Sequence, residues 1–257
     1  MSAAHNFAAR LRSKERLIGY WSMMDAHIVV ERLARVGYDY ICIDGQHGLL
    51  DYKGWLNALL AIDAGAALGN TPTVGMVRVP ANDPAWIGQA LDAGAVGVIV
   101  PLINTEADAA RASDAAHYPP MGTRSYGPMR AQLRISTDLA EANESVVCIA
   151  MIETPQGLEN VAEIAAVPGI DALYIGPSDL RIAVGGSSST DAAVDSVFLE
   201  ALRRVREAAG DLPVGIHTPS GEVAHARLAE GFDFVTIASD LVHLEQIATS
   251  HLAVAGS

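Results

Sequence analysis

Two carboxylates follow the ends of two successive apolar runs near the middle of the chain. Glu153 comes directly after the run at 146–152, and Asp179 follows the run at 172–175 through a turn at 176–178. Each run has the character of a short buried strand. Acids just past the ends of neighbouring parallel strands lie side by side, where they suit a divalent cation that keeps water or substrate oxygens. Each acid also fits a helix cap, so both interpretations stay open at this point.

Eight β-like runs alternate with amphipathic helical stretches along the 257 residues. Strands are expected at 17–21, 40–44, 73–77, 97–100, 146–152, 172–175, 213–216 and 234–237. Helices are expected near 27–36, 51–66, 83–93, 105–117, 156–166, 193–209, 221–230 and 241–252. Most runs are apolar on both faces, as parallel strands covered by helices are. The strict alternation predicts an α/β fold, a single (β/α)8 TIM barrel over residues 1–257, with two small domains as the alternative.

One long segment interrupts this alternation. Residues 118–143 form an insertion before the fifth strand and carry Arg124, Arg130 and Arg134. Long loops in compact domains are usually functional or disordered. We expect Arg124 or Arg130 to contact the far end of a substrate or a neighbouring subunit.

Composition excludes several classes of protein. The net charge of −13 argues against binding to nucleic acid or to an anionic membrane surface. No apolar run reaches the roughly 20 residues of a transmembrane helix, and the N-terminal residues have no signal-peptide pattern. Cys42 and Cys148 lie inside strand-like runs and are expected to be buried thiols in a reducing compartment. We therefore expect a cytoplasmic protein.

Polar and aromatic residues gather at the carboxyl ends of the expected strands, where TIM barrels carry out chemistry. These residues are Trp21, Asp44, His47, Arg78, Glu153, Asp179, His217 and Asp240. Each has a structural interpretation: a turn for Asp44 and His47, an ion pair for Arg78, and a helix cap for Asp240. Together they predict an anionic substrate on a metal, with an acid–base group nearby.

Lysine is informative because it is rare. The chain has only Lys14 and Lys53, and neither falls at the carboxyl end of a strand. A Schiff-base mechanism needs a positioned lysine and is disfavoured. Enolate chemistry here would depend on a metal as Lewis acid.

An ordered set of motifs makes the chain similar to a known family. The motifs are Asp-Gly-Gln-His-Gly at 44–48, Val-Arg-Val-Pro at 77–80, Leu-Asp-Ala-Gly-Ala at 91–95, Val-Pro at 100–101, Tyr-Pro-Pro-Met-Gly-Thr-Arg at 118–124, Ile-Glu-Thr at 152–154 and Ile-Gly-Pro-Ser-Asp-Leu at 175–180. In this order the chain resembles the HpcH/HpaI family of metal-dependent (class II) pyruvate aldolases. That family lies within the phosphoenolpyruvate/pyruvate-binding TIM-barrel superfamily.

The resemblance implies a role for each candidate residue. It makes Glu153 and Asp179 ligands of Mg²⁺, Mn²⁺ or Co²⁺, and it makes Arg78 the partner of the keto or enolate oxygen. It assigns the proton of the aldol hydroxyl to His47 with Asp44, which lies three residues before it, close enough to orient the ring.

Further roles concern the wall of the site. By the same resemblance, Trp21 lines the pocket and Asp92 helps to order the site, either within its own subunit or across a subunit boundary. The backbone at Gly176, Pro177 and Ser178 would hold the pyruvate carboxylate. His217 is a candidate substrate contact because of its place at the end of the seventh expected strand, with a structural role as the alternative.

The implied activity is the reversible aldol cleavage of a 4-hydroxy-2-oxo acid to pyruvate and an aldehyde. Such acids include 4-hydroxy-2-oxoheptanedioate and related 2-keto-3-deoxy acids. The apolar last helix and the resemblance imply a homo-oligomer, and the expected assembly is a hexamer. Three departures bear on the choice of aldehyde: Gln46 replaces Glu, Met151 replaces Gln, and His217 stands at an apolar position of the best-known members.

Other functions remain to be weighed. A lyase of the same superfamily that acts on an acyl-CoA or a citrate-like acid would need a basic patch, for which Arg124, Arg130 and Arg134 are the only candidates. A phosphosugar barrel would need a Gly-rich phosphate cradle after strands seven and eight, and residues 217–221 make a poor one. A non-catalytic binding protein would not need metal acids and an acid–base group together.

Overall fold

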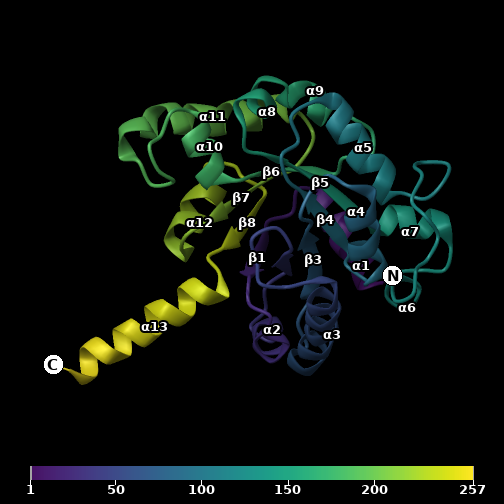
Figure 1. Ribbon diagram of the computed structural model, residues 1–257, viewed down its shortest axis with the longest axis horizontal. Coiled ribbons are helices and arrows are strands. Elements are labelled where there is room, and N and C mark those ends of the chain that lie inside the picture. The colour runs from purple at the N-terminus through teal and green to yellow at the C-terminus, as the bar shows by residue number, and fades with distance from the viewer. Residues whose placement is uncertain (1, 257) are drawn as a thin grey trace.

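The computed structural model describes residues 2–256 and contains a closed barrel of eight parallel strands in the order β1 to β8 (Figure 1). The strands are β1 (Leu17–Ser22), β2 (Tyr40–Asp44), β3 (Val74–Arg78), β4 (Gly97–Val100), β5 (Val147–Ile152), β6 (Ala172–Ile175), β7 (Val214–Thr218) and β8 (Phe234–Ile237). The barrel closes where β1 pairs with β8, with Gly19 opposite Thr236. The predicted (β/α)8 TIM barrel is confirmed.

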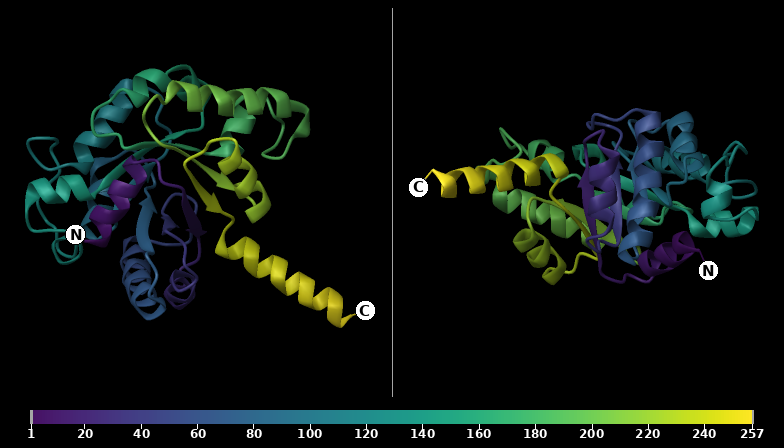
Figure 2. Two further views of the ribbon diagram at one scale, coloured as in Figure 1. Left: turned by 180° about the vertical axis from the view of Figure 1, so that it is seen from behind. Right: turned by 90° about the horizontal axis from the view of Figure 1, so that it is seen from below.

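Helices surround the barrel on its outer side, as the views in Figures 1 and 2 show. They are α1 (Ala3–Arg12), α2 (His27–Ala34), α3 (Tyr52–Gly69), α4 (Pro84–Asp92), α5 (Glu106–Ala116), α6 (Ala131–Arg134), α7 (Leu139–Ser145), α8 (Pro155–Glu159), α9 (Val161–Ala165), α10 (Pro177–Ala183), the 3₁₀ turn η1 (Ala192–Val194), α11 (Asp195–Ala208), α12 (Gly221–Ala229) and α13 (Asp240–Ala255). Two of the expected helices, 156–166 and 193–209, are broken in the structure. The first is split into α8 and α9 at Asn160, whose side-chain amide donates to the carbonyl of Asn104 at 2.8 Å.

Helix α1 was not predicted, although its sequence carries the signals of a helix. The Ser2 hydroxyl accepts the backbone N–H of His5 and caps its start. Its buried residues follow the i, i+3, i+4, i+7 spacing of an amphipathic helix, and they are Ala4, Phe7, Ala8 and Leu11. Phe7 packs edge-on against Tyr40 of β2, at 5.8 Å between ring centroids.

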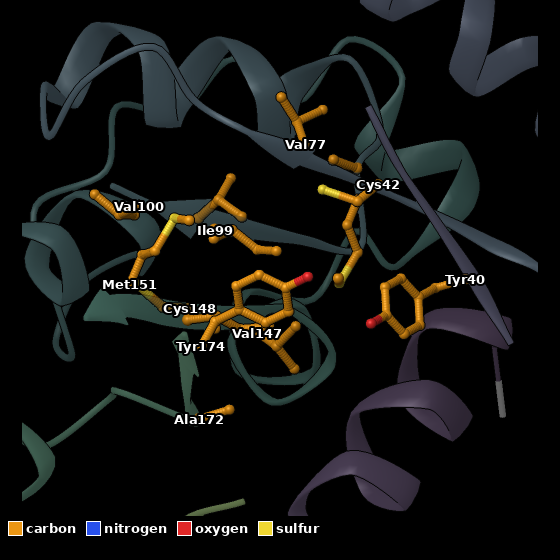
Figure 3. Close-up of a cluster of buried hydrophobic side chains, with 14 of the residues drawn as sticks. Tyr40, Cys42, Val77, Ile99, Val100, Val147, Cys148, Met151, Ala172 and Tyr174 are labelled. Atoms are coloured by element: carbon orange, nitrogen blue, oxygen red, sulfur yellow. The ribbon is translucent and has the colours of Figure 1, made fainter. Parts of the chain in front are cut away.

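Large side chains fill the barrel and a few small residues admit them. Tyr40 and Tyr174 both hydrogen-bond to the Thr236 hydroxyl, at 2.8 and 2.7 Å. A Cβ at Gly19 would lie 2.2 Å from the Tyr40 ring, so only glycine lets that ring fill the space beside β1. Figure 3 shows Tyr40 and Tyr174 among the buried strand side chains of this core.

Both cysteines lie inside this core, as the sequence predicts. Cys42 and Cys148 are fully buried free thiols on β2 and β5. Burial raises the pKa of each thiol well above its ordinary value, because the thiolate would lose its hydration. Neither side chain is suited to nucleophilic chemistry.

The insertion at 118–143 lies at the amino-terminal end of the barrel. It joins the end of α5 to the start of β5 and contains α6 and most of α7. Its arginines pair with acids on the outer helices: Arg124 with Asp92 at 2.7 Å, Arg134 with Asp63 at 2.6 Å, and Arg130 also with Asp63. The expectation that Arg124 or Arg130 reaches the substrate is therefore wrong within one protomer, because the loop is at the opposite end from the strands' carboxyl ends.

Helix α13 extends away from the barrel, as all three views in Figures 1 and 2 show. Its only buried residue is Asp240, whereas Leu244, Ile247 and Leu252 are 55, 55 and 75 % exposed. The start of the helix is held in place, because the Asp240 carboxylate accepts the backbone N–H groups of Met23 and Met24, which directly follow β1. Across residues 2–256 the structure contains no helix that is long and apolar enough to cross a membrane.

Candidate active site

A cavity of about 290 Å³ opens at the carboxyl ends of the strands. It brings together every predicted site residue except Asp92, Glu153 and Asp240: Trp21, Asp44, His47, Arg78, Gly176, Pro177, Ser178, Asp179 and His217. Sequence reasoning missed Met23, Tyr174 and Val242 as lining residues. The position of Tyr174 on β6 was predicted, but nothing in the sequence shows which buried strand residue faces the cavity.

Asp44 is the most highly connected side chain of this cavity. It ends β2 directly beside Arg78, the last residue of β3, because the two are partners in the strand register. Arg78 donates to the carboxylate at two points, Nε to Oδ1 at 2.9 Å and Nη2 to Oδ2 at 2.5 Å. Trp21 Nε1 and the backbone N–H groups of Gln46 and His47 also donate to it, at 3.2, 3.0 and 3.2 Å.

Both members of this pair are charged. Burial alone would raise the pKa of Asp44, but the hydrogen bonds and the charge of Arg78 outweigh it and hold that pKa below its ordinary value. Burial would likewise lower the pKa of Arg78, and Asp44 more than compensates, so the pKa is raised. The guanidinium keeps Nη1 without a hydrogen bond to the described residues. One donor edge of Arg78 is therefore available to a substrate oxyanion.

Aromatic rings form one wall beside Arg78. The Arg78 guanidinium carbon lies 5.0 Å from the centroid of Trp21, which stacks on Tyr174 at 6.0 Å and meets the edge of His217 at 5.4 Å. Burial, together with the charge of Arg78, lowers the pKa of His217 to about 4 against an opposing effect of Asp44. His217 is therefore neutral at pH 7.

His47 lies in the turn after β2, and its side chain is exposed. The Asp44 carboxylate binds the backbone N–H of His47 and not its ring. Within residues 2–256 the imidazole makes no hydrogen bond, so it is free to meet a substrate.

Glu153 and Asp179 lie close together at the ends of β5 and β6, but they differ in environment. Glu153 is 3 % exposed, and its Oε1 accepts the backbone N–H of Leu102 at 2.9 Å. A Cβ at Gly176 would lie 2.5 Å from Glu153 Oε2, so glycine is required where this turn passes the carboxylate. Asp179 is exposed in the first turn of α10.

Neither acid caps a helix. Thr154, and not Glu153, caps α8, because its hydroxyl accepts the backbone N–H of Gly157 at 3.0 Å. Asp179 lies inside α10, which begins at Pro177. The same correction applies to Asp240: Ser239 caps α13, and Asp240 is a buried acceptor for the segment after β1.

The chemistry of this acid pair fits a divalent cation. Burial raises the pKa of Glu153, and the negative charge of Asp179 raises it further, against opposing effects of Leu102 and Arg78. Two carboxylates that repel one another are stabilised by a cation between them. No three His, Cys, Asp or Glu side chains in residues 2–256 form a metal-binding group, so the protein would supply two carboxylates and leave the other positions to water or substrate. Mg²⁺ commonly binds in this way.

Asp92 lies away from these residues. It ends α4 at the amino-terminal end of the barrel, where it pairs with Arg124. The Arg124 guanidinium in turn lies 4.5 Å from the centroid of Tyr118. Asp92 therefore does not reach the cavity of its own protomer.

Two of the three departures from the family pattern, Met151 and His217, line this cavity, and the third, Gln46, lies in the turn after β2. Met151 lines the cavity, and its Cε would meet a Cβ placed on Gly176 at 2.6 Å. Gln46 has a buried Oε1 that has no hydrogen-bond partner among the described residues. The cavity therefore has a thioether wall beside Gly176.

Known proteins share both the sequence and the fold of this chain. It is 43 % identical to a hydroxypyruvate/pyruvate aldolase of Rhizorhabdus wittichii, over 91 % of each chain. It is 36 % identical to a 2-dehydro-3,6-dideoxy-6-sulfogluconate aldolase of Pseudomonas putida, over 90 % of this chain and 89 % of that one. The crystal structure of an HpcH/HpaI aldolase/citrate lyase family protein from Burkholderia cenocepacia J2315 superposes with a TM-score of 0.86 at 31 % identity, covering 98 % of this chain and 100 % of that one. The family model described as HpcH/HpaI aldolase/citrate lyase matches residues 17–246, and the chain belongs to this family.

Proposed function

We propose that this protein is a carbon–carbon lyase that cleaves a 4-hydroxy-2-oxo acid reversibly into pyruvate and an aldehyde. The observation that carries the proposal is one cavity with two kinds of charge. Asp44, Arg78 and Asp179 line the cavity, and Glu153 lies behind Gly176 of the lining, where its charge interacts with that of Asp179. The names of the curated relatives, which are aldolases, support the same reaction class.

Arg78 would bind the 2-oxo oxygen of the substrate through its free Nη1. Cleavage of the C3–C4 bond leaves negative charge on this oxygen, and a preoriented guanidinium in a site with little water stabilises such charge strongly. Asp44 keeps Arg78 in place before the substrate arrives, since it binds two nitrogens of the guanidinium. The backbone from Gly176 to Asp179 would hold the substrate carboxylate.

Glu153 and Asp179 would hold a divalent cation, Mg²⁺, Mn²⁺ or Co²⁺. When bound, such an ion supplies Lewis-acid polarisation of the oxo group. The exposed ring of His47 would accept the proton of the 4-hydroxyl as the bond breaks and return it in the reverse reaction.

The acyl-CoA or citrate-like alternative loses its support in the structure. Its candidate phosphate-binding arginines, Arg124, Arg130 and Arg134, lie at the amino-terminal end of the barrel and are paired with Asp63 and Asp92. Within one protomer none of them lines the cavity.

We also propose that the chain forms a homo-oligomer, a hexamer in its fully assembled state. The apolar side chains of α13 are exposed along a helix that leaves the barrel, and exposed apolar surface of this kind marks a protein interface. A second copy of the chain is the partner that would cover them.

Pyruvate release from 4-hydroxy-2-oxo acids, assayed with and without chelator, tests the proposed reaction. Activity that stops with chelator and returns with Mg²⁺ or Mn²⁺ supports it. Activity on acyl-CoA esters alone would refute it.

A further inference from the structure

The first cavity adjoins a larger one, and the rings of Trp21 and Tyr174 belong to the first alone. The larger cavity has a volume of about 570 Å³ and lies between α10, α12 and the starts of α11 and α13. Both cavities share His217, but only the first is lined by Trp21 and Tyr174. The two rings therefore belong to the part of the site that contains Arg78 and Asp44.

Trp21 contacts both members of the buried ion pair. Its Nε1 donates to Asp44 Oδ2 at 3.2 Å, and the Arg78 guanidinium carbon lies 5.0 Å from its ring centroid. The Trp21 ring is nearly parallel to that of Tyr174, with 12° between the planes and 6.0 Å between the centroids. Offset stacking at such a separation is favourable. The orientation of Trp21, and with it the position of the Asp44 carboxylate, therefore depends on where the Tyr174 ring lies.

The Tyr174 ring is held at its hydroxyl end by further hydroxyl groups inside the barrel. Tyr174 donates to the Thr236 hydroxyl at 2.7 Å, and the Thr236 and Tyr40 hydroxyl oxygens are 2.8 Å apart. Tyr40 in turn donates to the Val235 carbonyl at 3.2 Å. Because each hydroxyl has a single hydrogen and that of Tyr40 is used on Val235, Thr236 donates to Tyr40. The three bonds form one directed chain that ends at a backbone carbonyl.

This hydroxyl chain, Tyr174–Thr236–Tyr40, is suited to hold a ring and not to carry protons. All three side chains are fully buried, and Figure 3 shows the hydroxyl ends of the two tyrosines pointing toward one another. Burial raises the pKa of both phenols, because the phenolate would lose its hydration, so both remain hydrogen-bond donors. A carbonyl has no hydrogen to release, so a chain that ends at one cannot pass a proton on.

Neighbouring rings confine the two tyrosines as well. Phe234 packs against Tyr40 and Tyr174, with 6.4 and 5.8 Å between the ring centroids. A Cβ at Gly215 would lie 2.3 Å from the Phe234 ring, as a Cβ at Gly19 would lie 2.2 Å from the Tyr40 ring. The adjacent strands thus lack side chains where these rings lie. Each tyrosine is therefore restrained by a packed ring in addition to its hydroxyl.

We propose that Thr236 is a positioning residue for the charged side of the site. Its hydroxyl fixes the Tyr174 ring, that ring fixes Trp21, and Trp21 helps to hold the carboxylate that orients Arg78. Thr236 lines neither cavity, so it acts on the reaction only through these side chains. The proposal rests on the aldol function proposed above and adds a residue to it. A small misplacement of a reacting group lowers the rate of a reaction strongly.

Two substitutions of Thr236 test this role. Thr236→Val removes the hydroxyl and keeps the shape of the side chain, whereas Thr236→Ser keeps the hydroxyl. Thr236→Val should lower kcat about 3- to 10-fold, the equivalent of one neutral hydrogen bond, for aldol cleavage and for solvent exchange of the pyruvate methyl protons. Thr236→Ser should recover most of the wild-type rate. The matched control is Thr218→Val, because the Thr218 hydroxyl is also buried but donates to the Thr236 backbone carbonyl.

Fluorine NMR of protein labelled with 5-fluorotryptophan tests whether the effect passes through Trp21. The chain has three tryptophans, and Trp55 and Trp86 pack against each other on α3 and α4, outside both cavities. Trp55→Phe and Trp86→Phe assign their signals one at a time. Thr236→Val should shift or broaden the Trp21 signal alone, whereas Thr236→Ser and Thr218→Val should leave all three signals at their wild-type positions.

Tyr174→Phe guards against a failure of Thr236→Val to fold. It breaks the same hydrogen bond from the other end and keeps the aromatic ring. It should lower both rates and change the Trp21 signal in the same way.

Failure of this proposal can be distinguished from failure of the aldol function, because the fluorine signals need no substrate. If Thr236→Val leaves both rates unchanged, or if Thr218→Val lowers them as much, the proposal is wrong. Lower rates with an unchanged Trp21 signal also overturn it, since the effect would not pass through Trp21. If the wild type shows neither exchange nor cleavage, the aldol function fails and the signal alone decides: a Trp21 change in Thr236→Val supports the positioning role, and no change overturns it.

Discussion

The guanidinium of Arg78 and the carboxylate of Asp44 form a two-point ion pair between the ends of adjacent strands. They are register partners in β2 and β3, and both side chains are buried. A residue that is to stabilise charge in a reaction must be held in advance, and this pair fixes the orientation of Arg78 through the barrel itself.

Asp44→Asn should destabilise the protein. The substitution leaves the Arg78 charge buried without its partner, and breaking a buried pair in this way costs about 3–5 kcal/mol. Urea unfolding at pH 7 measures the change. The control is Asp51→Asn, because Asp51 caps α3 from an exposed position and asparagine caps equally well.

The same pair predicts a pH dependence. Because the native-state pKa of Asp44 is lowered, its contribution to stability is complete above the ordinary carboxyl pKa of about 4 and is lost as the pH falls through the lowered value. The difference between wild type and Asp44→Asn should therefore shrink in acid. A difference that stays constant down to the acid transition would contradict the assignment.

Glu153→Gln should stabilise the metal-free protein while it abolishes turnover. The raised pKa of Glu153 means that the native state binds this proton more tightly than the unfolded chain does, so the charged side chain costs stability once the pH exceeds its native pKa. Glutamine removes the charge and can still accept the Leu102 N–H. A gain on the order of 1 kcal/mol would raise Tm by about 2–4 °C.

Thermal melts with and without Mg²⁺ complete this test. The wild type should gain stability when Mg²⁺ is added, whereas Glu153→Gln and Asp179→Asn should gain none. Equal stabilisation of all three proteins would exclude these acids as the ligands.

His47→Ala should lower kcat for aldol cleavage roughly 10²–10⁴-fold, the usual range for a general acid–base group. Solvent exchange of the pyruvate methyl protons should fall less, because the metal-binding acids and Arg78 are unchanged. Proton NMR in deuterated buffer follows exchange beside a coupled assay of cleavage. Equal losses in both assays would assign His47 to enolisation as well, and no loss in either would make it a structural turn residue.

Borohydride added together with pyruvate should not inactivate the enzyme. Lys14 precedes β1 and therefore lies at the amino-terminal end of the barrel, where its ammonium group donates to the Gly210 carbonyl. Lys53 is exposed in the first turn of α3 and lines neither cavity. A reduced pyruvyl adduct on either lysine, found by mass spectrometry, would overturn the imine-free mechanism.

Leu244→Asp combined with Leu252→Asp should dissociate the assembly. Charges on exposed positions of α13 cannot be buried against a second copy without a large cost. Light scattering measures the mass in solution, and Glu245→Lys on the same helix serves as the control for a change of charge alone. A monomeric wild type would refute the oligomer directly.

Much of the fold could be predicted because strand ends in a TIM barrel meet at one place. The apolar runs before Asp44, Glu153 and Asp179 fixed which residues would share that rim, and the structure places them there. The position of the insertion followed from the same alternation, but Arg124 and Arg130 do not line the cavity of their own protomer, and their contact with a neighbouring subunit stays a prediction. Residues 118–143 lead from helix α5 into strand β5, and in a TIM barrel every such segment lies at the amino-terminal ends of the strands.

Contacts between distant residues could not be read from local patterns. Asp240 has the spacing of a helix cap, yet it accepts N–H groups of the segment after β1, more than 200 residues away in the chain. The break of the expected helix 156–166 depends on the partner of Asn160 in another loop. The larger cavity arises where several loops and helices meet, and no single stretch of sequence carries a signal for it.

Asp44 binds Trp21 of β1 and Arg78 of β3 through one carboxylate, whereas the larger cavity is built from elements after β6. This separation gives the barrel a constant half and an exchangeable half. Under the proposed function, residues 181–246 can change to accept new aldehydes while the half that would handle the keto acid keeps its geometry, provided that His217 and Asp240, which contact Trp21 and the backbone after β1, are kept. Thr236 must be kept as well, because its hydroxyl holds the Tyr174 ring. A combinatorial library aimed at new carbon–carbon bonds should therefore be confined to that second half, where sequence variation leaves the charged rim of β1 to β3 intact.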